Sequence, residues 1–483
     1  MSDVKAKPLG FFGQLIENFS LAEFTPQEAS FVVKGRLCHM FSSLNFNISA
    51  AAALAAYMRH SGGSSTTMAV HAGAVRSATN LCNLFISPAV GCLSDTIGRK
   101  PLMIGGRLGW ALWWVLLANI DRFSAYSGVG PMRLRFIGEI LCWGIIQAGT
   151  WSVFTASQAD LFGTRPTLMA KVSTTGGFCW DIGDSCGSLA SGLLASRAPT
   201  FSIYLSAVCA MASIGIISTM PETLPKEKRR PFKLTEANPI GSLGMLVNNG
   251  VGVTRLATMT GLLFSTYDTW TTRNAYRMGE LGLSASSISY ISIYNAICMM
   301  FSQNSIVLPL HQKSGFTTAM HVGCIGGAIA FMFEGLSWAG TPRVRLLLCL
   351  AGVSFHGLLT EICGHSFRPM ITKQGIEYSK KQQKKAVDAG LPAPGTMGLG
   401  ALSAAVSNLS SLLGIAFPLV WSGLYSFFGA GRGRKLLGAG GHWFIAGAFL
   451  LTASAVLRTS NPKDMYLNIA DEVHESPKKK KTA

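Results

Sequence analysis

The sequence has few charged residues for its length. Only 13% of its 483 residues are Asp, Glu, Lys or Arg, roughly half of the 25% that is typical of soluble domains. This shortage argues against a soluble enzyme of several domains. The 49% content of hydrophobic residues excludes a disordered chain, which combines low hydrophobicity with high charge. The mean hydropathy of +0.34 instead favours a membrane protein, and the length accommodates about a dozen spans of ~20 residues.

Motifs of metal sites and of common enzymes are missing. The 11 cysteines form no Cys-x-x-Cys pair and no Cys/His spacing of a metal site, so we expect neither a metal nor a cofactor. The nine histidines are not clustered as in zinc proteases. A Walker loop and a nucleophile elbow are absent as well, which disfavours an enzyme.

Acidic residues are scarcer than basic ones. The chain has 41 Lys and Arg against 23 Asp and Glu, a net charge of +18. No basic domain with interleaved aromatic residues accompanies this excess, so we predict no nucleic-acid partner. In a membrane protein, basic residues hold cytosolic loops against anionic lipid. If both termini are placed in the cytosol, more Lys and Arg residues lie in the cytosolic loops and tails than in the outer loops, so their distribution favours this orientation. The run of Arg432, Arg434 and Lys435 lies on the opposite side, which leaves an odd number of spans open.

Twelve apolar segments are long enough to span a bilayer. They lie at roughly 37–58, 67–91, 101–120, 132–157, 168–194, 201–220, 252–271, 287–310, 317–338, 344–366, 397–428 and 442–458. We predict an all-α membrane protein with two six-helix bundles, 37–220 and 252–458. A cytosolic linker at 221–251 joins them, and cytosolic tails at 1–36 and 459–483 flank them.

Two basic segments have alternative interpretations. The insertion at 371–396, inside the second bundle, carries Lys380, Lys381, Lys384 and Lys385 at helical spacing. It is either a solvated cytosolic loop or a helix on the lipid surface. The chain ends in Lys-Lys-Thr-Ala, which resembles a dilysine retrieval signal of the endoplasmic reticulum. A basic tail attracted to lipid is the alternative.

A motif follows the second predicted span. The string Gly91-Cys92-Leu93-Ser94-Asp95-Thr96-Ile97-Gly98-Arg99-Lys100-Pro101 combines glycines for a tight turn with a carboxylate for a helix N-terminus and basic residues for the inner membrane face. It resembles the signature loop of the major facilitator superfamily, GxLaDrxGrk. The matching residues are Gly91, Leu93, Asp95, Gly98, Arg99 and Lys100.

Further motifs are similar to the drug:proton antiporter and tetracycline-resistance-like branches of that superfamily. Pro221–Pro225 closes the sixth span, and Asp160 and Arg165 follow the fourth. Asp184 stands where the antiporter motif GPxxGG has its proline. In the second half, the equivalent of the signature loop keeps mainly Gly315. The resemblance implies two six-helix bundles that rock around a central cavity, with the Gly91–Lys100 loop acting in gating.

Ionisable residues inside spans are costly and are therefore functional candidates. Depth along the spans selects the central ones as proton or substrate sites: Arg76, Glu139, Asp181, Asp184, His356 and Glu361. Asp268 and Glu334 lie closer to span ends. A static pair of Arg76 with Asp181 or Asp184, which would only fix helix packing, is the alternative to a proton site. Further polar candidates for the cavity are Gln147, Asn295 and Asn408.

The function predicted from these residues is secondary active transport of a small organic solute by alternating access, with a proton as coupling ion. We expect the chain to act as a monomer in the lipid bilayer. A receptor or scaffold that resembles a transporter but carries no solute is the alternative, because the second-half motif is eroded and the antiporter proline is replaced.

Overall fold

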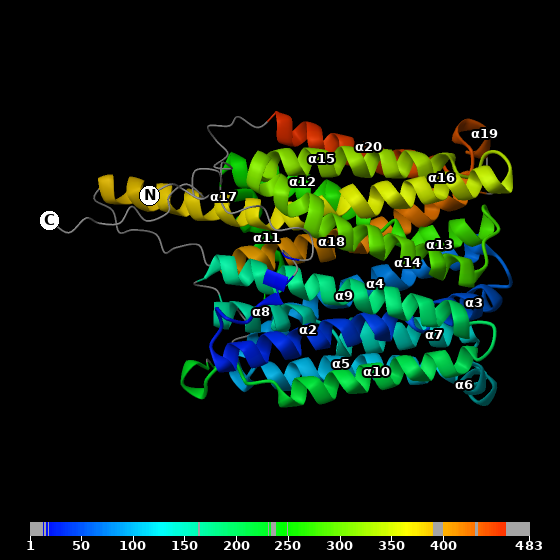
Figure 1. Cartoon of the computed structure of the whole chain (residues 1–483), viewed down its shortest axis with the longest axis horizontal. Helices are drawn as coiled ribbons and strands as arrows, with labels where there is room; N and C mark the ends of the chain where they lie inside the picture. The colour runs from blue at the N-terminus through cyan, green and yellow to red at the C-terminus, as the bar shows by residue number, and fades with distance from the viewer. Residues whose placement is uncertain are drawn as a thin grey trace.

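The computed structural model describes residues 13, 16–17, 19–162, 165–229, 231–232, 238–248, 250–389, 399–429 and 433–459. Within these ranges the chain forms helices and loops and contains no β-strand. The helices run side by side along the long axis of the molecule (Figure 1). The predicted all-α fold is therefore confirmed.

Six helical segments form the first half. They are α2 with α3 (Pro26–Asn47 and Ala50–His60), α4 (Ser65–Ile97), α5 (Arg99–Ala118), α7 with η1 and α8 (Pro131–Glu139, Ile140–Ile146 and Thr150–Phe162), α9 (Pro166–Leu194) and α10 (Pro199–Thr219). The short helix α6 (Ile120–Ser127) joins the third and fourth segments.

The second half repeats this arrangement. Its segments are α12 with α13 (Val251–Tyr267 and Trp270–Gly279), α14 with η4 (Ala285–Ser302 and Gln303–Val307), α15 (Leu308–Leu336), α16 with η5 and α17 (Pro342–Phe355, His356–Thr360 and Glu361–Asp388), α18 (Leu399–Gly429) and α20 (Gly441–Arg458). The short helix α19 (Arg434–Leu437) precedes α20.

Local signals explain where several helices begin. Thr25 caps α2 in a capping box with Glu28, in which each side chain binds the other residue's backbone N–H. Ser284 caps α14 and Thr341 caps α16 through their hydroxyl groups. Proline stands in the first turn of α9 and α10, where its missing N–H costs nothing.

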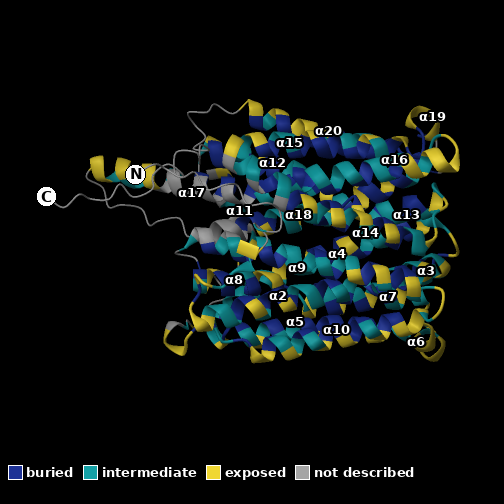
Figure 2. Ribbon diagram, in the orientation of Figure 1, coloured by how far each residue is buried: buried dark blue, intermediate teal, exposed yellow. Residues whose placement is uncertain are grey.

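Eight of the described helical segments are long and apolar enough to cross a membrane. Four others, α2–α3, α4, α9 and α12–α13, lie where spans are predicted but are interrupted or more polar. Large apolar side chains are exposed on the peripheral helices, as expected for contact with lipid: Phe201, Val208 and Met211 on α10, Leu347 on α16 and Leu451 on α20. Figure 2 shows buried residues concentrated between the helices.

The two halves meet mainly along two helix pairs, with smaller contacts between α13 and α4 and between α14 and α3. Helix α4 packs on α18, and α9 packs on α14. Ser65 at the start of α4 accepts a hydrogen bond from Tyr425 near the end of α18 at 2.9 Å. The Asn80 amide, halfway along α4, donates to the Gly414 carbonyl at 2.7 Å. These contacts run from the predicted outer ends of both helices to their middle.

The basic insertion and the linker both contain helix. Helix α17 continues the tenth span as far as Asp388, so residues 371–388 are not an extended loop. Figure 1 shows this end of α17 projecting beyond the bundle instead of lying along its end. In the predicted polar linker, α11 (Pro239–Asn248) packs against α18. The end of the insertion at 390–396, the terminal Lys-Lys-Thr-Ala and Arg432 lie outside the described residues.

Candidate functional site

The signature loop forms a compact charged network where α4 gives way to α5. Gly98 has φ +105°, a conformation that favours glycine, and it separates the two helices. The Arg99 side chain turns back and binds the Ser94 hydroxyl and both Asp95 and Asp160, at N–O distances of 2.5 Å and 3.1 Å to the two carboxylates. Asp160 comes from α8, so Arg99 ties three spans together.

A different carboxylate from the predicted one caps α5. Glu222, from the segment after α10, accepts the backbone N–H groups of Arg99 at 3.0 Å and Lys100 at 3.2 Å. The interpretation of Asp95 as the helix cap is therefore wrong, because its carboxylate is taken by Arg99 one turn later. Arg99 is thus held between two carboxylates, those of Asp95 and Asp160. This guanidinium stays charged.

The equivalent turn of the second half keeps the same backbone feature. Gly315 has φ +75°, and the helix is interrupted there in the middle of α15. It lies between the eighth and ninth spans, as Gly98 lies between the second and third. The turn of the second half has the same positive φ as the turn of the first half, but its other side chains differ. This backbone requirement explains why Gly315 is the main residue that matches the motif.

Arg76 bridges the two halves. Its Nε lies 3.6 Å from Oδ1 of Asp268, which sits at the break between α12 and α13. The Arg76 side chain is 47% exposed, whereas that of Asp268 is 11% exposed. The predicted static pair of Arg76 with Asp181 or Asp184 is wrong. Asp268 was placed near a span end, but the helix break brings it opposite α4.

Asp181 of the first half interacts with residues of the second half. Asp181, on α9, is 2% exposed and accepts a hydrogen bond from the Gln303 side chain of the second half. Its Oδ2 has no hydrogen-bond partner. The charge of Glu361 acts on Asp181, and Asp184 adds a third carboxyl one turn away on α9. Asp184 itself accepts a hydrogen bond from Ser188 at 3.1 Å.

The glycines around Asp184 have a packing role. A Cβ added to Gly183 would lie 2.9 Å from the Ser43 side chain, and one added to Gly187 would lie 2.8 Å from Asn47. Both neighbours belong to α2. The glycines of this antiporter-like motif thus let α9 lie close against α2, and they hold Asp184 at the edge of that contact.

His356 lies near a buried charged cluster in the second half. Glu334 on α15 pairs with Arg277 at 2.7 Å and with Arg273 at 3.3 Å, both from α13. The charges of these arginines act on His356, whose Nδ1 has no hydrogen-bond partner. His356 begins the π-helix η5, and π-helices often mark functional positions.

The three polar cavity candidates lie apart. Gln147 ends the π-helix η1 and its side chain is half-buried. The Asn295 amide on α14 points at the Met299 sulfur, 3.1 Å away. Asn408 is buried and donates to the Pro239 carbonyl of α11 at 3.2 Å. These three residues thus come from different helices and have different partners.

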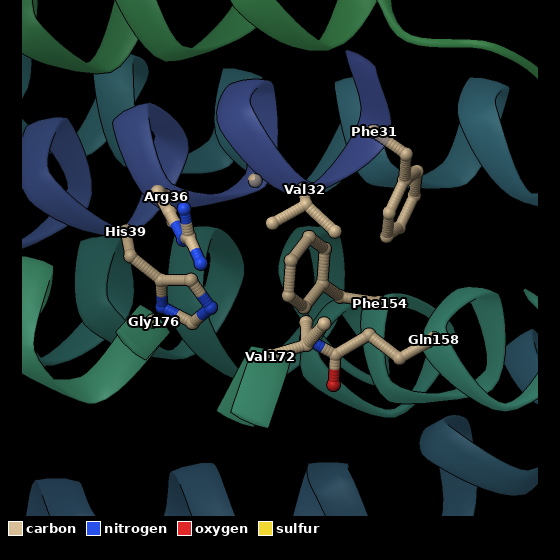
Figure 3. A pocket seen from close by; sticks show the side chains of 9 residues that line it. Phe31, Val32, Arg36, His39, Phe154, Gln158, Val172 and Gly176 are labelled. Carbon is tan, nitrogen blue, oxygen red and sulfur yellow. The ribbon is translucent and has the colours of Figure 1, made fainter. Parts of the chain in front are cut away.

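A small pocket lies inside the first half, between α2, α8 and α9 (Figure 3). Its volume is about 10 Å³, far below the roughly 300–1,000 Å³ of most ligand sites. The Arg36 guanidinium at its wall donates to Thr175 at 3.0 Å, so it already has a protein partner. The lining residues are Phe31, Val32, Gly35, Arg36, His39, Phe154, Gln158, Val172 and Gly176.

Sequence reasoning missed several residues of these networks. Asp268 lies near the end of the predicted span at 252–271, and Arg273 and Arg277 lie beyond it. Their signal was present, because α13 has one strongly polar face and one apolar face. Gln303 lies inside the predicted span at 287–310, where its amide is one of many polar groups that could line a cavity. It is identified only by its contact with Asp181.

The sequence matches the family model of the Major Facilitator Superfamily over residues 37–367. The chain therefore belongs to this superfamily and is an integral membrane protein with several spans.

Two known proteins are similar to this chain in sequence. Major facilitator superfamily domain-containing protein 10 of Homo sapiens is 29% identical over 160 residues, 33% of this chain and 32% of that protein. The match thus spans about a third of the human protein's length. The class C tetracycline resistance protein of Escherichia coli is 21% identical over 369 residues, 75% of this chain and 82% of that protein.

Solved structures share the fold. The human organic anion transporter MFSD10 has a TM-score of 0.61 and 21% identity, covering 90% of this chain and 100% of that chain. The xylose transporter XylE from E. coli, in a partially occluded inward-open conformation, has a TM-score of 0.58 and 13% identity, covering 90% and 98%. At these identities the likeness concerns the fold.

Proposed function

We propose that this chain is a secondary active transporter that moves a small organic solute by alternating access, with proton movement as the coupled step. The observation that carries this proposal is the arrangement around Asp181. A buried carboxylate of one half accepts a hydrogen bond from Gln303 of the other half, and the charge of Glu361 acts on it, at the seam that must open and close in a rocking mechanism.

Proton coupling follows from the electrostatics of this seam. Two ionised carboxylates in a region of low dielectric repel each other, and no basic partner of Asp181 is found among the described residues. A proton on Asp181 or Glu361 therefore stabilises the packed arrangement. When the halves separate, water hydrates both groups and favours release of that proton. Opening and deprotonation thus support each other.

The similar proteins support a role in transport, but their names do not point to a single kind of transported solute. One is named for organic anions, one for tetracycline resistance and one for xylose. These cargoes differ in charge and shape, so the proposal extends to a small organic solute and the proton only. The transport-inactive scaffold is less favoured, because the signature network of Arg99, Asp95 and Asp160 is intact.

Asp181→Asn tests the coupling. Purified protein is first screened with a solute library by thermal shift, because binders stabilise the folded state. A solute found this way is then applied to proteoliposomes that contain a pH-sensitive dye. Wild-type protein should move protons when the solute is added, and Asp181→Asn should lose at least about 90% of this flux, since removing one essential group costs tenfold or more.

Solute exchange without a pH gradient separates coupling from folding. Asp181→Asn should retain exchange, because no net proton movement is required. Asp121→Asn, which alters an exposed carboxylate in an outer loop, serves as control and should match wild type. Undiminished proton flux in Asp181→Asn would remove this residue from the mechanism. Failure of every solute to produce flux in wild-type protein would favour the scaffold.

The distribution of Lys and Arg supports a proposal for the orientation and the cellular location of the protein. We propose that the protein acts as a monomer with both termini in the cytosol and that its Lys-Lys-Thr-Ala end retains it in the endoplasmic reticulum. Helix α2 begins and α20 ends at the same end of the bundle (Figure 1), which agrees with termini on one side. A tagged chain with Lys480→Ser and Lys481→Ser should leave the reticulum, as seen by microscopy. An unchanged location would reject the retention signal.

A further inference from the structure

Arg76 has a second carboxylate nearby, on its own half of the molecule. Glu139 is the last residue of α7, directly before the π-helix η1. Helix α4, which carries Arg76, packs against both α7 and η1, and the charge of Arg76 acts on Glu139 as well as on Asp268. Arg76 therefore lies between an acidic group of the first half and an acidic group of the second half. The Arg76 guanidinium therefore has two carboxylates with which it could form an ion pair, Glu139 and Asp268.

The contact between Arg76 and Asp268 is loose. It consists of one N–O approach of 3.6 Å, although a guanidinium has five N–H donors. The Arg76 side chain is about half exposed. By contrast, Arg277 is 8% exposed and pairs with its glutamate at 2.7 Å. Arg76 is thus free to turn, whereas the buried arginine is fixed.

Glu139 is able to take over from Asp268. Its present partner is Arg135, one turn earlier on the same helix, at 2.9 Å. Arg135 also lies over the ring of Tyr57, with 3.8 Å between the guanidinium carbon and the ring centroid. This cation–π contact would continue to hold Arg135 if Glu139 turned towards Arg76. The adjoining π-helix gives the backbone at Glu139 a less regular hydrogen-bond pattern than an α-helix.

We propose that Arg76 exchanges Asp268 for Glu139 when the outer ends of the two halves separate. Opening carries α13 away from α4, and Asp268 moves with it. An arginine left without a partner in a partly desolvated site is costly. Glu139 stays with Arg76 because both belong to the first half, so the open state keeps an ion pair. Glu139 is therefore a positioning residue that balances the open against the closed state.

This inference rests on the proposed alternating access. It predicts opposite effects for the two carboxylates. Glu139→Gln removes the partner used in the open state and should lower the outward-open population about tenfold, within the usual range of coupling between sites. Asp268→Asn removes the partner used in the closed state and should raise that population by a similar factor. A purely structural role would not give opposite signs.

Distances between the outer ends measure these populations. Spin labels are placed at Tyr126→Cys on α6 and Leu436→Cys on α19, which are 94% and 75% exposed. The exposed native Cys186 is replaced by Ser in the background. Double electron–electron resonance in nanodiscs then reports a short and a long distance for the closed and open states. Glu280→Gln, which alters an ion pair with Arg434 on the outer side, is the control and should match the background.

The outcomes separate this inference from the proposed function. Equal distance distributions in Glu139→Gln and the background would overturn the exchange of partners, and so would a shift towards the open state. A single distance in the background at every pH and solute tested would instead reject alternating access. If Glu139→Gln does not fold, Arg135→Gln gives a second test. It frees Glu139 for Arg76 and should raise the open population, and a fall would also overturn the inference.

Discussion

Replacing Glu334 by Gln is expected to destabilise the protein by about 3–5 kcal/mol, the usual cost of breaking a buried ion pair. Glu334 is 5% exposed and neutralises two arginines, Arg273 and Arg277, with N–O distances of 3.3 Å and 2.7 Å. Both guanidinium groups are largely buried. The variant leaves them without a counter-charge, facing each other on one turn of α13.

Thermal unfolding in detergent measures this loss. The control is Glu23→Gln, which removes an ion pair of similar length with Lys171, 2.7 Å, but at a position where the glutamate is 59% exposed. Surface pairs contribute about 0–1 kcal/mol, so the control should unfold close to wild type. A Glu334→Gln protein as stable as the control would show that the two arginines find other partners or water.

Much of the fold could be predicted because its signals are local. A span is recognised from about 20 consecutive residues, and the signature loop from one short string. The Gly98 turn with its positive φ follows from that string, whereas the ion pairs of Arg99 with Asp95 and Asp160 do not. Family membership follows from the same residues.

Side-chain partners could not be predicted, because they depend on how helices rotate and break. Counting residues from a span start placed Asp268 at a membrane edge. The interruption between α12 and α13 instead turns it towards Arg76. In the same way, Arg273 and Arg277 lie beyond the predicted end of the span at residue 271, although α13 carries them inward to Glu334. The break between α12 and α13, which the sequence did not reveal, therefore moves three charged residues from the expected membrane edge to the interior.

The site around Asp181 was predicted in part. Burial of Asp181 followed from its central position in a span. Glu361 was also selected by depth, but nothing in the sequence showed that its charge acts on Asp181 or that Gln303 donates to Asp181. The hydrogen bond from Gln303 depends on how the two halves pack, with α9 against α14.

Gly73→Ala is expected to block closure of the outer side and to reduce transport at least about tenfold, which corresponds to ~1.4 kcal/mol between the two states. A Cβ at Gly73 would meet the Ser422 side chain and would lie 2.7 Å from the Pro418 carbonyl of α18. A hydroxyl is able to rotate away, but a backbone carbonyl moves only with its helix. Helix α18 must therefore shift away from α4, and this shift favours the outward-open state.

Gly105→Ala separates this steric effect from helix propensity. Gly105 lies within α5 and has open space at the Cβ position, so both substitutions gain the helix preference of alanine and only Gly73→Ala creates a clash. Closure is measured with Ser65→Cys, because Ser65 lies at the outer seam and binds Tyr425. Its reaction with a membrane-impermeant maleimide should accelerate in Gly73→Ala and stay unchanged in Gly105→Ala. Equal rates in both variants would show that the α4–α18 contact does not control access, since a seam that opens must expose the residues along it.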